Sequence, residues 1–177
     1  MLTTHIYTDG ACSSTDNTGG WAVVIEIEAI QPYHTHNMGN YHAKTTANYL
    51  SYTGHDCDTT NNRMELTALL VALTFISEQP TNYDFIIYTD SAYIANCFSQ
   101  NWYVNWRKNG WKGSNKKPIA NQDLWKQILS YYDHLQLRTT IQHVKGHGNC
   151  LGNALADRLA VEERLALRQK LNKDENN

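Results

Sequence analysis

The stretch "IYTD" occurs twice in the chain, at residues 6–9 and again at residues 87–90. Each copy is a run of β-favouring Ile, Tyr and Thr that ends in an aspartate, and a small residue, Gly10 or Ser91, follows it. An alanine comes next in both copies, and the sequences beyond it share nothing, so the repeat is not a duplication. We interpret it as one device used twice, in which two strands end side by side in aspartates. Two carboxylates placed so close repel each other unless cations lie between them.

Hydrophobic periodicity around the two copies predicts an α/β fold. The clearest helix spans residues 59–78, where Thr60 or Asn61 is expected to cap the N-terminus and Pro80 to end the helix. The Thr- and Tyr-rich segment 31–58 predicts one or two further strands, paired antiparallel with the strand before them. The remaining pattern predicts strands over 2–9, 21–30, 84–89 and 137–144, a turn over 10–19, and helices from Ser91, over 120–133 and over 151–171. This order indicates a mixed sheet with helices packed on it.

The composition is that of one ordinary globular domain, with 41% hydrophobic and 18% charged residues. We expect this domain to span residues 1–171 and residues 172–177 to form a flexible tail. The net charge is −2, so any affinity for nucleic acid must come from a local patch. The four cysteines form no CxxC pair and are expected to be free thiols. The chain shows no signal-peptide pattern and no apolar run of membrane length, so we expect a cytoplasmic protein without a membrane partner.

Two further carboxylates stand on predicted helices. Glu65 falls on the same helical face as Leu69, Ala72 and Ile76, where a lone carboxylate would be buried at high cost. Asp157 interrupts an apolar stripe of the last predicted helix. Each acid also has an ordinary explanation: a turn or cap aspartate, a first-turn glutamate favoured by the helix dipole, or a solvated helix face. Taken together, these acids and the two strand-end aspartates predict a site of hard oxygen ligands suited to Mg²⁺ or Mn²⁺.

His147 lies between glycines in "VKGHGNC", just before the last predicted helix. A histidine in such a loop, close to carboxylates, is suited to proton transfer. The spacing of His143, His147 and Cys150 also permits a zinc interpretation, but no fourth ligand stands at a familiar spacing. We therefore favour the proton-transfer interpretation.

A basic, tryptophan-rich segment without Asp or Glu extends from Ser91 to Gln122. Cations of this kind neutralise phosphates, and indoles stack on bases or sugars. The alternative for the indoles is a structural one, in which Trp102, Trp106 and Trp125 anchor a helical arm to the core. The segment holds five cations and three indoles: Arg107, Lys108, Lys112, Lys116 and Lys117, with Trp102, Trp106 and Trp111.

These pieces, in this order, resemble ribonuclease H of type 1, the standalone bacterial form. The resemblance rests on "YTDGAC", "TTNNRMEL", "IYTDS", "NWYVNWRKNGWK", "VKGHGN" and "NALAD", and it covers most of residues 3–165. It implies the RNase H-like fold, with a five-stranded mixed β-sheet flanked by helices and a basic helical protrusion. It also implies endonucleolytic hydrolysis of the RNA strand of RNA·DNA hybrids, leaving 5′-phosphate and 3′-hydroxyl ends.

The resemblance implies a role for each residue of the predicted site. Asp9, Glu65, Asp90 and Asp157 match the family's four metal-binding carboxylates, and His147 matches its mobile histidine. Two divalent ions, Mg²⁺ or in its place Mn²⁺, would serve such a reaction at a separation of roughly 3.5–4 Å. Asp9 would bridge the two ions, Asp157 would help hold the ion that activates water, and Glu65 and Asp90 would hold the ion at the leaving 3′-oxygen.

The resemblance also implies substrate contacts. Asn61 and Asn62 match residues that contact the RNA minor groove, where 2′-hydroxyls mark RNA. Thr60 matches a pocket for a DNA-strand phosphate, and Asn153 matches a residue beside the active site. The basic segment matches the protrusion that grips the DNA strand, with Trp102, Trp106, Lys108 and Lys112 as the foremost contacts. The chain departs from the family pattern at Asp58, where a basic residue is frequent, and at Ala92, where Gln is frequent.

Three other functions compete with this one. A related two-metal nuclease acting on DNA would not need the "TTNN" element, which reads 2′-hydroxyls. A hybrid-binding protein without catalysis would not need four carboxylates and His147. A binding module with a structural metal would have a poor ligand set here. We therefore expect a metal-dependent ribonuclease H that acts as a monomer on an RNA·DNA hybrid.

Overall fold

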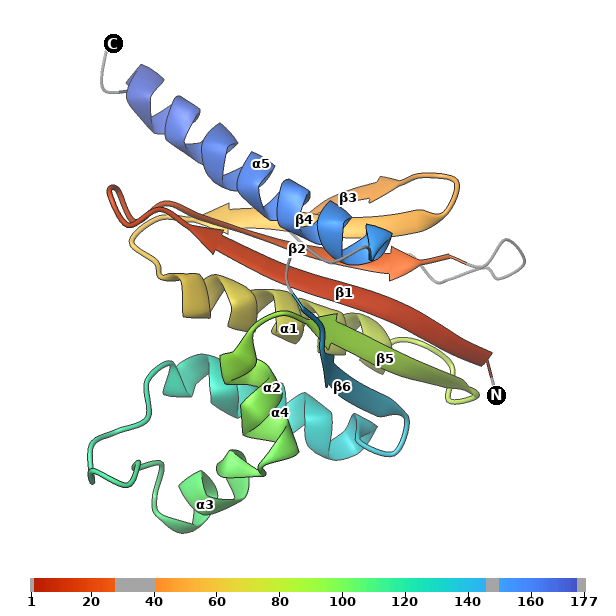
Figure 1. The fold of residues 1–177 in the computed structure, drawn as a ribbon, viewed down its shortest axis with the longest axis vertical. Coiled ribbons are helices and arrows are strands. Elements are labelled where there is room, and N and C mark those ends of the chain that lie inside the picture. The colour runs from red at the N-terminus through yellow and green to blue at the C-terminus, as the bar shows by residue number, and fades with distance from the viewer. Residues whose placement is uncertain (1, 28–40, 146–149, 175–177) are drawn as a thin grey trace.

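The two copies of the repeated tetrapeptide lie side by side in the sheet. In the computed structural model, which describes residues 2–27, 41–145 and 150–174, they belong to β1 (Leu2–Cys12) and β5 (Tyr83–Thr89). The two strands pair in parallel, with Ile6 opposite Ile87 and Thr8 opposite Thr89 (Figure 1). The predicted juxtaposition of the two copies is thus confirmed.

The described strands form one mixed sheet in the order β3-β4-β2-β1-β5-β6. On one side of β1, β2 (Gly19–Glu26) and β4 (Tyr49–Asp56) pair antiparallel, and on the other side β6 (Thr139–His143) runs parallel to β5. These five strands are the expected ones. The sixth is the short edge strand β3 (His42–Thr45), which pairs antiparallel with β4, so the segment 31–58 supplies two strands.

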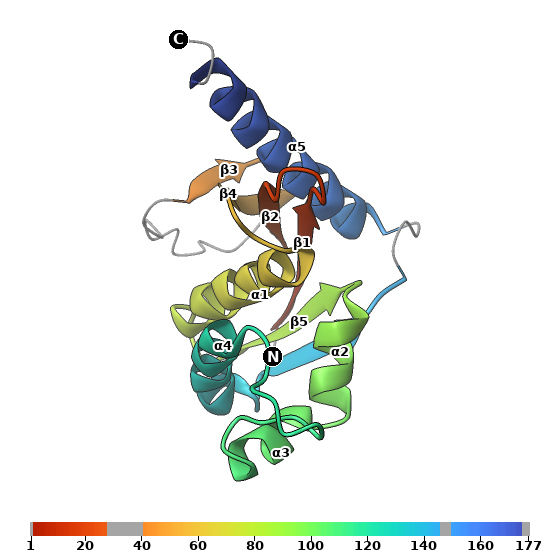
Figure 2. The same ribbon diagram turned by 90° about the vertical axis from the view of Figure 1, so that its left-hand side faces the viewer.

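Helices cover both faces of this sheet. One face carries α1 (Asn61–Ser77) and α4 (Gln122–Leu135), while α5 (Leu151–Asp174) crosses the other face over β1, β2 and β4 (Figures 1 and 2). After β5, α2 (Ala92–Ser99) and α3 (Trp102–Lys108) lead outward, and we call residues 92–121 the protrusion. The predicted helices are therefore all present, and the protrusion contains one more short helix.

Coverage on both faces explains the continuous apolar run Trp21–Ile25 in β2. Successive side chains of a strand point to opposite faces, so both faces of β2 must be apolar if both are covered. Val23 joins the main core with Leu69 of α1, whereas Val24 packs with Tyr7 and Ala156 under α5. Burial of this kind contributes roughly 25 cal/mol per Å² of apolar surface, and it fixes both helix layers relative to β1.

The N-termini of two helices are capped by the residues that precede them. The Thr60 hydroxyl accepts a hydrogen bond from the backbone N–H of Arg63 at 3.3 Å, so Thr60 rather than Asn61 is the cap of α1. Ser91 caps α2 in the same way, as its place after the second "IYTD" predicts. Thr60 stands next to Asn61, and Ser91 stands next to Asp90. The two caps therefore fix the first residues of α1 and α2 beside the predicted site.

The prediction that β1 ends at Asp9 is wrong. The strand continues to Cys12, and Gly10, Ala11 and Cys12 pair with Trp21, Gly20 and Gly19 of β2. The glycines suggested a turn, but here they make room for helices packed against the sheet. The last predicted helix is also longer than expected, because α5 continues to Asp174, three residues beyond its predicted end. The predicted strand end at Ile30 lies outside the described residues.

The structure tests two predictions from composition, which concern the cysteine thiols and membrane-spanning segments. All four cysteines are free thiols, as predicted. Among the described residues, no helix combines the length and the apolar character that a membrane span requires.

Candidate active site

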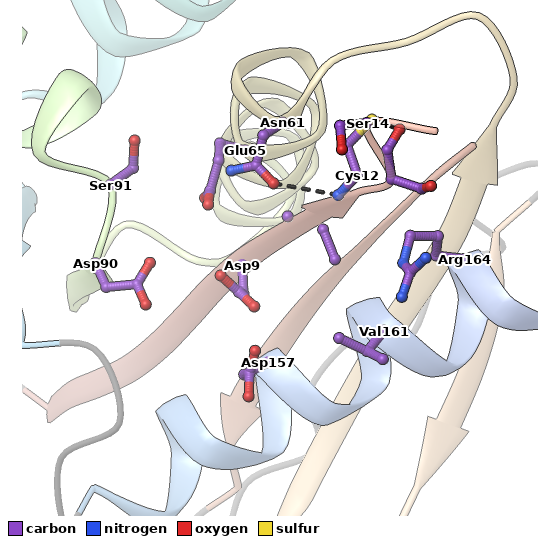
Figure 3. Close-up of a pocket in the computed structure, with 13 residues that line it drawn as sticks. Asp9, Cys12, Ser14, Asn61, Glu65, Asp90, Ser91, Asp157, Val161 and Arg164 are labelled. Carbon is purple, nitrogen blue, oxygen red and sulfur yellow. Dashed lines mark hydrogen bonds between the residues drawn. The ribbon is translucent and has the colours of Figure 1, made fainter. Parts of the chain in front are cut away.

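Three carboxylates converge at the centre of the sheet. Asp9 lies in β1, Asp90 directly follows β5, and Glu65 lies in the first half of α1. A carboxylate oxygen from each of the three falls within 4.8 Å of the others (Figure 3). The parallel register of β1 and β5 brings the two aspartates together, because Asp9 and Asp90 follow the opposed residues Thr8 and Thr89.

The position of Glu65 depends on the close packing of α1 against β1. A methyl group at Gly10 would collide with the backbone of Met64 and Glu65, so only glycine allows α1 this close. The approach carries the Glu65 carboxylate into the interior beside Asp9, where it is 4% exposed. The prediction that Glu65 lies on the buried face of its helix is confirmed.

Burial and like charge make these acids hard to ionise. Burial raises the pKa of Asp9 to about 8, and the nearby charges of Asp90 and Asp157 add to the rise against a hydrogen bond from the Gly10 N–H. Burial also raises the pKa of Glu65 to about 9, with further contributions from Asp9 and Asp90. One Glu65 oxygen, Oε2, is buried without a hydrogen-bond partner among the described residues. Such a cluster is incomplete as a network of protein groups alone.

Asp157 approaches Asp9 from the other face of the sheet, on α5. It lies outside the group of three, yet it lines the same cleft and raises the pKa of Asp9. Figure 3 shows the Asp9 carboxylate between Asp90 and Glu65 on one side and Asp157 on the other. The structure therefore brings together all four carboxylates that the sequence singled out.

The cleft that holds the four acids has a volume of about 660 Å³ and extends well beyond them. Its far end is formed by residues that the sequence analysis did not single out for a site: Cys12 at the end of β1, the loop residues Ser13 and Ser14, and Val161 and Arg164 of α5. Val161 and Arg164 stand four and seven residues after Asp157, which is the spacing of one helical face. That spacing was the available signal for both residues.

One further residue of the predicted site, Asn153, lies away from the cleft. Asn153 is buried in the first turn of α5, and its Oδ1 has no hydrogen-bond partner among the described residues. It does not line the cleft. His147 lies outside the described residues.

The predicted minor-groove residues lie at the N-terminus of α1. Asn61 and Asn62 are exposed, and Asn61 lines the cleft beside Glu65. Its Oδ1 accepts a hydrogen bond from the backbone N–H of Cys12 at 3.2 Å, which leaves the amide nitrogen free to donate. Thr60 is exposed and caps the helix.

The protrusion carries exposed cations over packed indoles. Lys108, Lys112, Lys116 and Lys117 are exposed and form no ion pair with any described residue. Arg107, in contrast, makes a bidentate pair with Asp133 of α4, at 3.0 and 2.8 Å, so part of its charge is already neutralised.

The indoles of this region divide between core and surface. Trp125 is fully buried, and it packs edge-on against Trp106 at 5.3 Å between ring centroids. Trp102 and Trp106 are only partly buried, and both line a second cavity with Lys112. The structural explanation therefore holds for Trp125, whereas Trp102 and Trp106 combine a packing role with an accessible face.

Comparison with known proteins agrees with this geometry. Residues 2–164 match the family model described as RNase H. The chain belongs to the ribonuclease H family. It is 38% identical over 163 residues to the ribonuclease H of Acetivibrio thermocellus, and the matched region covers 92% of this chain and 95% of that one. It is also 38% identical over 169 residues to the ribonuclease H of Chlorobaculum parvum, covering 95% and 97% of the two chains.

Solved structures of ribonuclease H share the fold. LC9-RNase H1, described as a type 1 RNase H with the type 2 active-site motif, superposes with a TM-score of 0.70 at 24% identity, covering 94% of this chain and 74% of that one. The RNase H domain of PFV superposes with a TM-score of 0.65 at 26% identity, covering 92% and 94%. The predicted RNase H-like α/β fold is confirmed, with β3 as an additional strand.

The residues present fit a ribonuclease H metal centre. The cluster offers only carboxylate oxygens, which are the ligands that hard divalent cations prefer. Burial and mutual repulsion raise the pKa values of Asp9 and Glu65, and bound cations would offset both by stabilising the ionised carboxylates. They would also give Glu65 Oε2 a partner, which it lacks among the described residues. The acidic cluster is thus typical of the family's metal site, and the two aspartates of the repeated tetrapeptide lie close together in it, as predicted.

Proposed function

We propose that the protein hydrolyses the RNA strand of RNA·DNA hybrids, leaving 5′-phosphate and 3′-hydroxyl ends, with two Mg²⁺ ions as cofactor and Mn²⁺ as a substitute. The observation that carries this proposal is the convergence of Asp9, Glu65 and Asp90 within 4.8 Å, in a chain that belongs to the ribonuclease H family. The rival with a structural metal has no support from this cluster, because it opens into a cleft rather than closing around an ion.

Four carboxylates would hold the ions and position the scissile phosphate. Bound divalent ions supply an activated water and neutralise charge at the leaving 3′-oxygen. Asp9 lies between the other acids, with Asp157 on one side and Glu65 and Asp90 on the other, so it is placed to serve both ions (Figure 3). The carboxylates must lose their protons to bind cations, so the raised pKa values of Asp9 and Glu65 make occupancy dependent on pH. We assign His147 to proton transfer or product release, in keeping with its place in the sequence.

Recognition of the hybrid is divided between two surfaces in this proposal. Asn61, which lines the cleft, and the exposed Asn62 beside it contact the minor groove of the RNA strand. Thr60 contributes to a DNA-phosphate pocket. Trp102, Trp106 and the lysines of the protrusion contact the DNA strand. Arg107 retains a weaker role, because Asp133 already pairs with it. We also assign Asn153, in the first turn of α5, to substrate binding beside the active site.

We also infer that residues 1–171 form one catalytic domain that acts as a monomer in the cytoplasm. One domain is supported by the single sheet and by the helices that contact it on both faces. A reducing compartment agrees with the four free cysteines.

One experiment separates this function from its rivals. Three end-labelled substrates of the same sequence are incubated with the protein: an RNA·DNA hybrid, a duplex RNA and a duplex DNA, each with Mg²⁺ and with EDTA. We expect loss of the RNA strand of the hybrid alone, only with Mg²⁺, and 5′-phosphates on the products. Cleavage of duplex DNA would favour the DNA-nuclease alternative, and binding without cleavage would favour a hybrid-binding protein.

A further inference from the structure

Arg164 projects into the cleft from α5, two helical turns after Asp157. It lines the cleft with Asn61, Cys12 and Val161, at the end opposite Asp90 (Figure 3). Its side chain is half-buried, and the guanidinium lies in the same cleft as the four carboxylates. The position of this positively charged side chain in a cleft formed largely by acids needs a functional explanation.

Arg164 differs from the other two arginines of α5 in its ion pairing. Arg158 pairs with Glu162 one turn along the helix at 3.8 Å, and Arg168 pairs with Asp16 of the loop after β1 at 3.1 Å. Arg164 forms neither an ion pair nor a side-chain hydrogen bond with any described residue. A half-buried guanidinium has five N–H donors, and none of those on Arg164 is satisfied by the described residues.

The backbone around Arg164 is held firmly. A methyl group at Gly20 of β2 would collide with the carbonyl of Ala160 and the N–H of Arg164, so α5 meets the sheet as closely as a helix can at this turn. The adjacent Glu163 accepts a hydrogen bond from the Thr53 hydroxyl of β4 at 2.6 Å, and its other oxygen lies 2.9 Å from Nδ1 of His55. These contacts fix the rotation of α5, which aims residue 164 at the cleft.

The walls around Arg164 suit an anion. The Arg168–Asp16 pair ties the loop after β1 to α5, and this loop presents Ser13 and Ser14 to the cleft. Burial raises the pKa of the Cys12 thiol, and the positive charge of Arg164 opposes the rise. The far end of the cleft therefore combines hydroxyl groups with a guanidinium that pairs with no carboxylate of the described part of the chain. This combination is the chemistry of a phosphate subsite.

We propose that Arg164 binds a backbone phosphate of the cleaved RNA strand, next to the scissile phosphate. This inference rests on the proposed function, because it takes the strand lying over the four carboxylates to be the RNA strand. Arg164 donates to the non-bridging oxygens of that phosphate and sets the register of the strand in the cleft. Its positive charge also offsets the repulsion that the acidic cluster exerts on an approaching polyanion.

The first test compares the kinetics of Arg164→Ala, Arg164→Lys and wild-type protein on an RNA·DNA hybrid with Mg²⁺. We expect Arg164→Ala to raise KM about tenfold with kcat changed less than about threefold, because a charge-assisted contact to a neighbouring phosphate is lost. The slope of log KM against log salt should fall by roughly one. Arg164→Lys should keep the salt slope and recover part of KM, because it retains the charge but not the forked donors.

Arg158→Ala is the matched control, since Arg158 stands on the same helix and pairs on the surface with Glu162. It should leave KM and the salt slope at their wild-type values. If Arg164→Ala behaves like Arg158→Ala in both measurements, the inference is overturned. An unchanged salt slope with a lowered melting temperature would also overturn it, because Arg164 would then act on folding alone.

A second test alters the phosphate instead of the arginine and compares wild-type protein with Arg164→Ala. A chimeric cleaved strand carries a short ribonucleotide block flanked by deoxynucleotides, and a single neutral methylphosphonate linkage is moved through the flanks. We expect one position near the block to raise the KM of the wild-type protein, and Arg164→Ala to add no further increase with that substrate. Additive effects at every position would contradict a contact between Arg164 and the phosphate.

The outcomes also separate this inference from the proposed function. If the wild-type protein does not cleave the hybrid, the proposed function fails. If the wild-type protein cleaves the hybrid and neither the Arg164 variants nor the neutral linkage alter KM, only the phosphate subsite fails.

Discussion

Asp9 and Asp90 have carboxylate oxygens within 4.8 Å of each other, although one residue lies in the first strand and the other follows β5. The parallel pairing of Thr8 with Thr89 produces this closeness, because the next residue of each chain segment is the aspartate. Glu65 completes the group from α1. Gly10 allows α1 to approach closely enough for this grouping.

Replacing Asp9 with Asn should reduce cleavage of an RNA·DNA hybrid with Mg²⁺ by at least about a thousandfold, because the central carboxylate of the site is lost. Circular dichroism and hybrid binding should stay near wild-type. Asp84→Asn is the control, since Asp84 stands at the opposite end of β5 from Asp90. Near-normal activity of Asp9→Asn would refute the catalytic assignment.

The stability of the metal-free protein should fall as pH rises from about 5 towards 9. The pKa of Asp9 is about 8 and that of Glu65 about 9, whereas both groups titrate near 4 when the chain is unfolded. Between these values the folded state binds more protons, so stability is greatest at low pH and is lost as pH passes through the folded pKa values. Each group contributes a slope of up to about 1.4 kcal/mol per pH unit.

Urea unfolding with EDTA at pH 5, 6, 7 and 8 measures this effect. Asp9→Asn should flatten the decline by about one proton, and it should be more stable than wild-type at pH 8. A decline with the same slope in Asp9→Asn and wild-type would show that Asp9 is not the titrating group.

Divalent cations should reverse this destabilisation. At a concentration of Mg²⁺ one hundred times the dissociation constant, the folded state gains about 2.7 kcal/mol. The shift in melting temperature caused by Mg²⁺ should be larger at pH 9 than at pH 7, because the carboxylates must be deprotonated to bind. Differential scanning calorimetry tests this on wild-type, Asp90→Asn and, as a control at an acid outside the cleft, Glu162→Gln. An equal shift in Asp90→Asn would place the bound ion elsewhere.

Gly10→Ala should destabilise the fold by about 2 kcal/mol, because the added methyl meets the backbone of Met64 and Glu65 and α1 must move away. The displacement carries Glu65 away from Asp9, so cleavage should fall even at temperatures where the variant is folded. Gly113→Ala is the matched control, since an added methyl there meets its neighbours at ordinary contact distances. If Gly10→Ala keeps wild-type stability, α1 does not pack as closely as described.

Replacing Lys108, Lys112, Lys116 and Lys117 together with Ala should raise KM for the hybrid and reduce the salt dependence of KM. Each phosphate contact that is lost should lower the slope by roughly 0.9. Lys170→Ala, an exposed lysine on the distal part of α5, serves as the control. A fourfold variant with the wild-type salt slope would remove the protrusion from substrate binding.

The elements of this fold were largely predictable because their signals are local. The helix with Glu65 follows from a cap at Thr60, a helical apolar period and Pro80, and the buried run Trp21–Ile25 indicates a strand covered on both faces. The end of β1 was not predictable in this way. Gly10 has the composition of a turn, but its role is to admit α1, and that role depends on a helix more than fifty residues later in the chain.

The sequence by itself determined the chemistry of this protein. It shows which acids stand in unusual places, which segment is basic, and which repeated tetrapeptide places an aspartate on each of two strands. Only the tertiary structure decided distances and pairings. It brought carboxylate oxygens of Asp9, Glu65 and Asp90 within 4.8 Å of one another and paired Arg107 with Asp133. It also placed Arg164 in the cleft without an ion-pair partner among the described residues. The physical reason is that composition and periodicity act within an element, whereas register, close packing and charge pairing arise between elements distant in the chain.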